Sequence, residues 1–204
     1  MAIKHDTPLP TEPVVIVPNQ TEELLYTRAM LEFLENSGLI EGRFELVNGR
    51  IYSKMGQNLP HSLSVGRLTR YLNGIESFQS ERVVSDVLLN LAPEREHPAP
   101  DVLVLREYKG KGKPAGSDLL LAVEVSDTTQ SRDFGGKVET YARAGIAEYW
   151  VLELPKRTLT VFRTPDAVAG TWGSRNTLAE TQTIAPESAP DALIRISELL
   201  PLTD

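Results

Sequence analysis

The segment LLLAVEVSDTTQSRDFGGKVETYARAG, residues 119–145, runs from an apolar strand into a helix and carries a carboxylate inside the strand. Five apolar residues precede Glu124, and Val125 follows it. A nearly continuous apolar run of this length is typical of a strand buried on both faces, which predicts a central position in a sheet. Residues 132–144 predict a helix that ends at Gly145, because glycine readily takes the left-handed conformation after a helix.

The buried position of Glu124 requires a partner for its charge. A lone carboxylate in a protein interior is strongly disfavoured unless it is paired, hydrogen-bonded or bound to a metal ion. Alternate side chains of a strand share a face, so Glu124 lies on the same face as Ala122 and Ser126. Val123 and Val125 then point to the opposite face. We therefore expect a partner for Glu124 nearby in the fold.

A second carboxylate, Asp101, opens the preceding apolar strand. If the two strands pair as a hairpin through the basic loop at residues 109–118, Asp101 and Glu124 lie near one another. Two adjacent carboxylates repel, and a divalent cation resolves the repulsion. Hard oxygen ligands suit Mg²⁺ or Mn²⁺. Lys137, on the helix that follows, would supply a positive charge close by.

The rest of the chain predicts helices on either side of the strands. The predicted elements are a helix over 21–38, a hairpin over 44–55 that turns at Asn48-Gly49, a helix over 60–78, and strands over 82–92, 100–108, 148–154 and 158–164. The last forty residues look less regular and end in a short strand and a helical turn. This order predicts an α+β fold, close to α/β, with a mixed β-sheet core flanked by helices.

The composition of the 204-residue chain excludes several classes of protein. Hydrophobic content of 41% and charged content of 24% indicate a globular protein, with an irregular proline-rich arm over residues 1–20 and a single domain over residues 21–204. The chain has no cysteine and three scattered histidines, which argues against disulfides, thiolate chemistry and a zinc site. A net charge of −7 argues against charge-driven coating of nucleic acid, so basic surfaces must be local.

The N-terminal sequence lacks the apolar stretch of a signal peptide, and no run approaches about 18 apolar residues. We therefore expect a cytoplasmic protein without a membrane-spanning segment.

Three segments in order, PAPDVLVL, LLLAVEVSDTT and RDFGGKVETYARAGIAEYWVLEL, resemble a bacterial restriction-endonuclease family, long of unknown function, in the PD-(D/E)xK nuclease superfamily. The segment FELVNGRIY resembles the Glu-Leu hairpin of that family and carries Glu45, and His61 matches a histidine that often opens the next helix. The resemblance covers roughly residues 22–165. The residues that match its core pattern are Pro100, Asp101, Glu124, Val125, Asp133, Lys137, Tyr141, Gly145, Glu148, Tyr149 and Trp150.

The resemblance implies a Mg²⁺-dependent (or Mn²⁺-dependent) endonuclease that hydrolyses phosphodiester bonds of DNA. Asp101, Glu124 and the backbone carbonyl of Val125 would hold the ion, which would polarise the phosphate and lower the pKa of a bound water. Lys137 would orient that water or stabilise the charge of the transition state. Glu45 would bind the same ion, a second ion, or a metal-bound water.

The chain departs from the superfamily at the lysine. The superfamily places this lysine two positions after the glutamate, on the same face of the strand, and Ser126 stands there in this sequence. The resembling family takes its lysine from the following helix, and Lys137 fits that place.

Four further residues are candidates for contact with the substrate. They are His61 and the three lysines of the basic loop, Lys109, Lys111 and Lys113, which could touch a phosphate backbone. The simpler interpretations are that His61 only opens a helix and that the loop is a solvated turn.

Structural roles also stay open for the predicted catalytic residues. Asp101 would be a turn residue after a proline, and Glu124 would be half of a structural ion pair with Lys137 or an arginine. Lys137 would be solvated, and Glu45 would be a surface residue of its strand. The corresponding alternatives for function are a catalytically inactive nuclease-fold module for binding or assembly, and hydrolysis of another phosphoester. A homodimer stays open.

Overall fold

The computed structural model describes residues 23–54, 58–78, 82–107, 112–127 and 132–202. The predicted N-terminal arm therefore lies outside the described residues, as do Lys109 and Lys111. No helix in the described part of the chain is long and apolar enough to cross a membrane.

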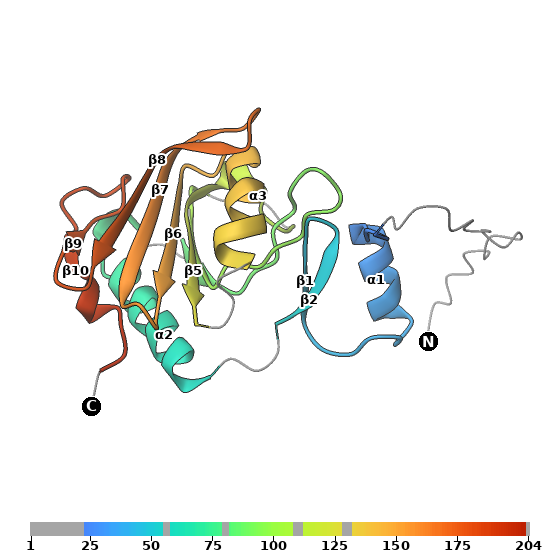
Figure 1. Cartoon of the computed structure of the whole chain (residues 1–204), viewed down its shortest axis with the longest axis horizontal. Coiled ribbons are helices and arrows are strands. Elements are labelled where there is room, and N and C mark those ends of the chain that lie inside the picture. Colours follow the sequence, from blue (N-terminus) through green and yellow to red (C-terminus); the bar gives the residue numbers. More distant parts are fainter. Residues whose placement is uncertain (1–22, 55–57, 79–81, 108–111, 128–131, 203–204) are drawn as a thin grey trace, which may run out of the picture.

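A six-stranded mixed sheet forms the centre of the molecule (Figure 1), with strand order β3-β4-β5-β6-β7-β8. Only β5 and β6 pair in parallel among these strands, and α3 connects them. The bounds are β3 Val83–Ser85, β4 Val102–Leu105, β5 Leu119–Ser126, β6 Glu148–Glu153, β7 Thr158–Asp166, β8 Thr171–Ala179 and α3 Lys137–Arg143. The predicted α+β fold with a mixed sheet and flanking helices is confirmed, and β5 takes the central, buried position expected of its apolar run.

Helices cover the two faces of the sheet (Figure 1). On one face, Leu68 and Leu72 of α2 (Leu59–Asn73) pack in the same core cluster as Val123 and Val125. On the other face, Ala122 belongs to the core cluster around α3. The alternation predicted for β5 is therefore correct, and it directs Glu124 toward α3.

A separate two-stranded hairpin lies on the side of α3, with α1 (Arg28–Asn36) beyond it (Figure 1). Its strands, β1 (Phe44–Val47) and β2 (Arg50–Ser53), turn at Asn48-Gly49, where both residues have positive φ as the predicted turn requires. Leu46 and His97 exchange two backbone hydrogen bonds of 2.7 and 3.1 Å, which attach the hairpin to the body of the protein.

Several predicted boundaries differ from the structure. Of the strand predicted over 100–108, β4 covers Val102–Leu105, and the helix predicted over 132–144 is α-helical only from Lys137 to Arg143, after a π-helical turn. The first helix begins at Arg28 rather than 21, because Thr27 is extended and its hydroxyl accepts the N–H of Met30 as a cap. The strand predicted over 82–92 ends at Ser85, since Asp86 takes φ +55 and turns the chain out of the sheet. The second helix begins one residue earlier than predicted and is followed by the short helix η1 (Glu76–Phe78).

The C-terminal region is more regular than predicted. The nine-residue strand β8 pairs along β7, and its mostly exposed residues give little apolar pattern because it lies at the sheet edge. The predicted short strand and helical turn at the end are present. The remaining elements are β9 (Thr183–Ile184), β10 (Ile194–Arg195), η4 (Ile196–Glu198), η2 (Gly116–Asp118) and a π-helical turn, η3 (Arg132–Gly136).

Candidate functional site

Charged side chains from the hairpin, the six-stranded sheet and its helices meet beside the α3 face of β5. Four carboxylates, two lysines, a histidine and a tyrosine form this group, here called the carboxylate cluster, and all are nearly inaccessible to solvent. Its members are Glu45, Lys54, His61, Asp101, Glu124, Asp133, Lys137 and Tyr141.

Lys137 lies at the centre of the cluster and is the partner that the burial of Glu124 required. Its Nζ is 2.8 Å from Oε1 of Glu124, 2.9 Å from Oε2 of Glu45 and 4.0 Å from Oδ1 of Asp133. The hydroxyl of Tyr141 donates a second hydrogen bond of 2.9 Å to Oε1 of Glu124. Positions 137 and 141 share one face of α3, so the helix presents both donors to the strand together.

Asp101 is bound to the strand that carries Glu124. The backbone N–H of Val125 donates to Oδ2 of Asp101 at 2.9 Å, and Nε2 of His61 donates to the same oxygen at 3.1 Å. Val102 pairs with Val123 in the antiparallel register of β4 and β5, so Asp101 lies opposite Glu124 one step further along. The predicted proximity of these two carboxylates follows from this hairpin.

Lys54 is the member of the cluster that the sequence interpretation missed. Its Nζ donates to Oδ1 of Asp101 at 2.9 Å and to the carbonyl of Ala99 at 3.0 Å. A signal for it existed in the hairpin. Tyr52 pairs with Glu45, and alternation places the residue two positions after Tyr52 on the same side as Glu45.

The charges gathered in the cluster shift the pKa values of its members. Burial would raise the pKa of Asp101, but the hydrogen bond from His61 and the charges of Lys54 and Lys137 outweigh it and hold this pKa below its ordinary value. Burial would lower the pKa of Lys137, yet Glu124 and the other carboxylates raise it, so the ammonium stays charged.

The pKa of Glu124 is raised by burial and by the neighbouring carboxylates. Burial and the charges of Asp101 and Asp133 raise its pKa to about 8, although Lys137 and Lys54 oppose the shift. Four carboxylates face two lysine ammonium groups, which leaves two negative charges in excess when all four are ionised. A proton on Glu124 reduces that excess, and a divalent cation would remove it.

The residues present therefore fit a divalent metal ion in donor type and in charge. In the described residues, no three acidic or histidine groups converge as a ready-made set of ligands. Lys54 and Lys137 instead occupy carboxylate oxygens that a cation would use. Nδ1 of His61 and Oγ of Ser126 are buried without a hydrogen-bond partner among the described residues, so polar groups remain for a ligand or water.

The structure separates one predicted substrate contact from the cluster. Lys113 donates to Nε2 of His97 at 2.8 Å and lies 4.0 Å from Glu32, in a different ionic group. Contact of Lys113 with a phosphate backbone stays a prediction. His61, in contrast, lies in the cluster through its bond to Asp101.

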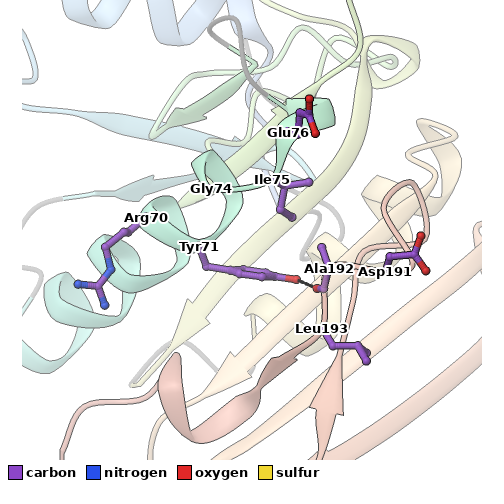
Figure 2. A pocket seen from close by; sticks show the side chains of 8 residues that line it. All are labelled: Arg70, Tyr71, Gly74, Ile75, Glu76, Asp191, Ala192 and Leu193. Atoms are coloured by element: carbon purple, nitrogen blue, oxygen red, sulfur yellow. Dashed lines mark hydrogen bonds between the residues drawn. The ribbon is translucent and has the colours of Figure 1, made fainter.

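A pocket of about 470 Å³ lies elsewhere, between α2 and the C-terminal segment around residues 191–193 (Figure 2). Figure 2 shows the ring of Tyr71 extending from α2, with its hydroxyl bonded to the carbonyl of Ala192. The pocket is lined by Arg70, Tyr71, Gly74, Ile75, Glu76, Asp191, Ala192 and Leu193, and by none of the predicted site residues. We therefore place the candidate site at the carboxylate cluster.

Comparisons with known proteins agree with this fold. The model of the Uma2 family, described as "Putative restriction endonuclease", matches residues 32–197. The chain is also similar in structure to a putative nuclease of DUF820 from Anabaena variabilis ATCC 29413, with a TM-score of 0.63 and 14% sequence identity over 85% of this chain and 96% of that one. No curated protein matches the chain significantly. The structural likeness supports the fold, and the family match supports a nuclease-like function.

Proposed function

Since the chain belongs to the Uma2 family, whose members are described as putative restriction endonucleases, we propose that it is a metal-dependent nuclease that hydrolyses phosphodiester bonds of DNA. The observation that carries this proposal is the buried pair of Asp101 and Glu124 on adjacent strands, in a cluster with two negative charges in excess. Such an excess is costly in a protein interior unless a cation or protons offset it. This arrangement suits a divalent ion, which in turn can bind a phosphate group of the substrate.

The ion would be held by Asp101, Glu124 and the backbone carbonyl of Val125, and Mg²⁺ or Mn²⁺ suits these oxygen donors. When bound, it supplies Lewis-acid chemistry, polarising a phosphate oxygen and lowering the pKa of a water molecule. Lys137 fixes the orientation of Glu124 and Glu45 by binding both, and its charge would stabilise the negative charge that develops on the phosphate.

The remaining members of the cluster hold these groups in place. Tyr141 donates to Glu124, and His61 donates to Asp101, so each of the two carboxylates has an aromatic donor besides its lysine. Such supporting hydrogen bonds restrict the orientation of ligands and tune their charge.

Cleavage of plasmid DNA tests the proposal. Purified protein with Mn²⁺ or Mg²⁺ is expected to nick supercoiled DNA, and Asp101→Asn, Glu124→Gln and Lys137→Met are each expected to reduce the rate at least about a hundredfold. Lys156→Met is the matched control, because Lys156 lies on a turn where its side chain is 62% exposed. Cleavage that persists unchanged in Glu124→Gln would exclude the carboxylate cluster as the source of activity. The rate of cleavage of an RNA of the same sequence tests whether DNA is the preferred substrate.

A second function, an inactive nuclease-fold module for binding or assembly, is favoured by the closed state of the cluster. Glu45, Asp101 and Glu124 are at most 4% exposed, and lysine ammonium groups already bind all three. A protein that neither binds Mn²⁺ in a calorimetric titration nor cleaves any nucleic acid would be such a module.

A further inference from the structure

The two lysines of the carboxylate cluster hold different carboxylates. Lys137 enters from α3 and bridges Glu45 and Glu124 with a side chain that is 1% exposed. Lys54 enters from the chain just after β2, and its side chain, 8% exposed, binds Asp101 directly.

Both oxygens of Asp101 accept hydrogen bonds from groups of unequal mobility. Oδ2 binds the backbone N–H of Val125, which the pairing of β4 and β5 fixes, and Nε2 of His61. Oδ1 accepts from Nζ of Lys54, which stands at the end of a flexible four-carbon side chain. Release of Lys54 would therefore remove its hydrogen bond to Asp101 without disturbing the pairing of β4 and β5.

A divalent ion and the ammonium of Lys54 would compete for the carboxylate of Asp101. An ion bound to this carboxylate and an ammonium 2.9 Å from Oδ1 would be like charges only a few ångströms apart in a buried site, where their repulsion is strong. A second position is available to the ammonium, since Oδ1 of Asp86 lies 4.0 Å from Nζ and this carboxylate is 28% exposed.

We propose that Lys54 is a positioning residue that takes the place of a cation at Asp101 while no metal ion is bound, and that its displacement lowers the affinity of the site for divalent ions. The inference rests on the metal site of the proposed function. It assigns Lys54 a role that differs from that of Lys137, which binds Glu124 and Glu45 and stays in place.

Calorimetric titration with Mn²⁺ tests the inference without any measurement of activity. Lys54→Met keeps most of the length of the side chain and removes its charge, and it is expected to lower the Kd for Mn²⁺ at least about tenfold relative to the wild type. Lys54→Arg keeps the charge and is expected to bind Mn²⁺ nearly as the wild type does. Lys156→Met makes the same change of net charge outside the cluster and is expected to leave the Kd unchanged.

The outcomes separate this inference from the proposed function. A Kd for Lys54→Met that equals or exceeds that of a Mn²⁺-binding wild type would overturn the role of Lys54 and leave the metal site standing. A merely structural lysine would give that result together with lower stability. Absence of Mn²⁺ binding in the wild type and in Lys54→Met would overturn both. If Lys54→Met does not fold by circular dichroism, Lys54→Gln, whose amide still donates to the carbonyl of Ala99, replaces it.

Discussion

One ammonium group, that of Lys137, offsets charge on several buried carboxylates at once. Its Nζ lies within 2.9 Å of Glu45 and of Glu124, and none of these three side chains is more than 3% exposed. Breaking a buried ion pair by removing one partner costs far more than the pair contributes, because the remaining charge stays buried without compensation. The lysine is therefore essential to the fold of the cluster, besides the role in catalysis that we propose for it.

Lys137→Met is expected to lower the free energy of unfolding by about 3–5 kcal/mol, since it leaves Glu45 and Glu124 buried without their ammonium. Urea unfolding at pH 7 with a chelator measures this loss. Arg50→Met, which breaks an ion pair with Glu23 in which both side chains are more than half exposed, is expected to cost about 1 kcal/mol or less. Similar losses for the two variants would show that Lys137 does not offset buried charge.

The pH dependence of stability in the metal-free protein is expected to carry a contribution from Glu124. Its pKa is about 8 in the folded protein against an ordinary 4.5. The stabilisation from this raised pKa is fully present below about pH 4.5, is lost as the pH rises, and is gone above about pH 8.

Glu124→Gln isolates that contribution, because glutamine resembles the protonated acid at every pH. The free energy of unfolding of the variant minus that of the wild type should grow between pH 5 and pH 8 and then level off. A difference that stays nearly constant over this interval would mean that Glu124 is ionised throughout and that Lys137 holds it so.

Among the individual residues of the cluster, the sequence predicts the carboxylates Glu124 and Asp101 better than the side chains that bind them. Glu124 is conspicuous because it interrupts an apolar strand, and Asp101 opens the strand beside it. Lys54 and Tyr141 gave weaker signals, since long side chains reach the cluster only when the hairpin and α3 pack against the sheet. The docking of separate elements decides such contacts, and no local pattern encodes it.

Among the elements, β5 and α3 carry Glu124, Lys137 and Tyr141, and their packing depends on a close approach at Gly116. This residue lies in η2, directly before β5, against the C-terminal end of α3. A Cβ at position 116 would lie 2.2 Å from the carbonyl oxygen of Ala144, so any side chain there pushes the helix and strand apart.

Gly116→Ala is expected to destabilise the protein by about 1–3 kcal/mol, the range found when a packed interior is overfilled. Gly66→Ala is the matched comparison, because Gly66 lies inside α2 and a Cβ added there would meet no atom within 4 Å. Alanine there should stabilise by about 0.5–1 kcal/mol, since glycine is a poor helix former. Thermal unfolding of the two variants should therefore move in opposite directions, and equal shifts would refute the close approach.

The elements that the sequence predicts well have a strong local signal. The apolar run of β5 and the turn at Asn48-Gly49 belong to this class. The sheet edges were predicted poorly, because β3 ends at the left-handed Asp86 and β8 presents alternately exposed polar residues with little apolar contrast. An edge strand is held by backbone pairing, which leaves few traces in side-chain pattern.

For the molecule as a whole, metal binding is expected to raise the free energy of unfolding. If Mn²⁺ binds only the folded protein, a concentration of 100 times Kd raises the free energy of unfolding by about 2.7 kcal/mol. Asp101→Asn and Glu124→Gln should lose this gain, which urea unfolding with and without Mn²⁺ measures. NaCl at equal ionic strength serves as the control, and an equal gain in Asp101→Asn would place the ion elsewhere.

The cluster draws its members from distant parts of the chain, and this has a consequence during translation. During synthesis, Glu45, Lys54 and His61 are added to the chain first. Asp101 and Glu124 follow much later, and Lys137 is added last of these. Unfinished chains therefore carry the acidic residues without the lysine that assembles them. If the chain has the activity proposed above, it therefore cannot cleave a substrate before α3 has been synthesised, because the cluster cannot assemble without Lys137.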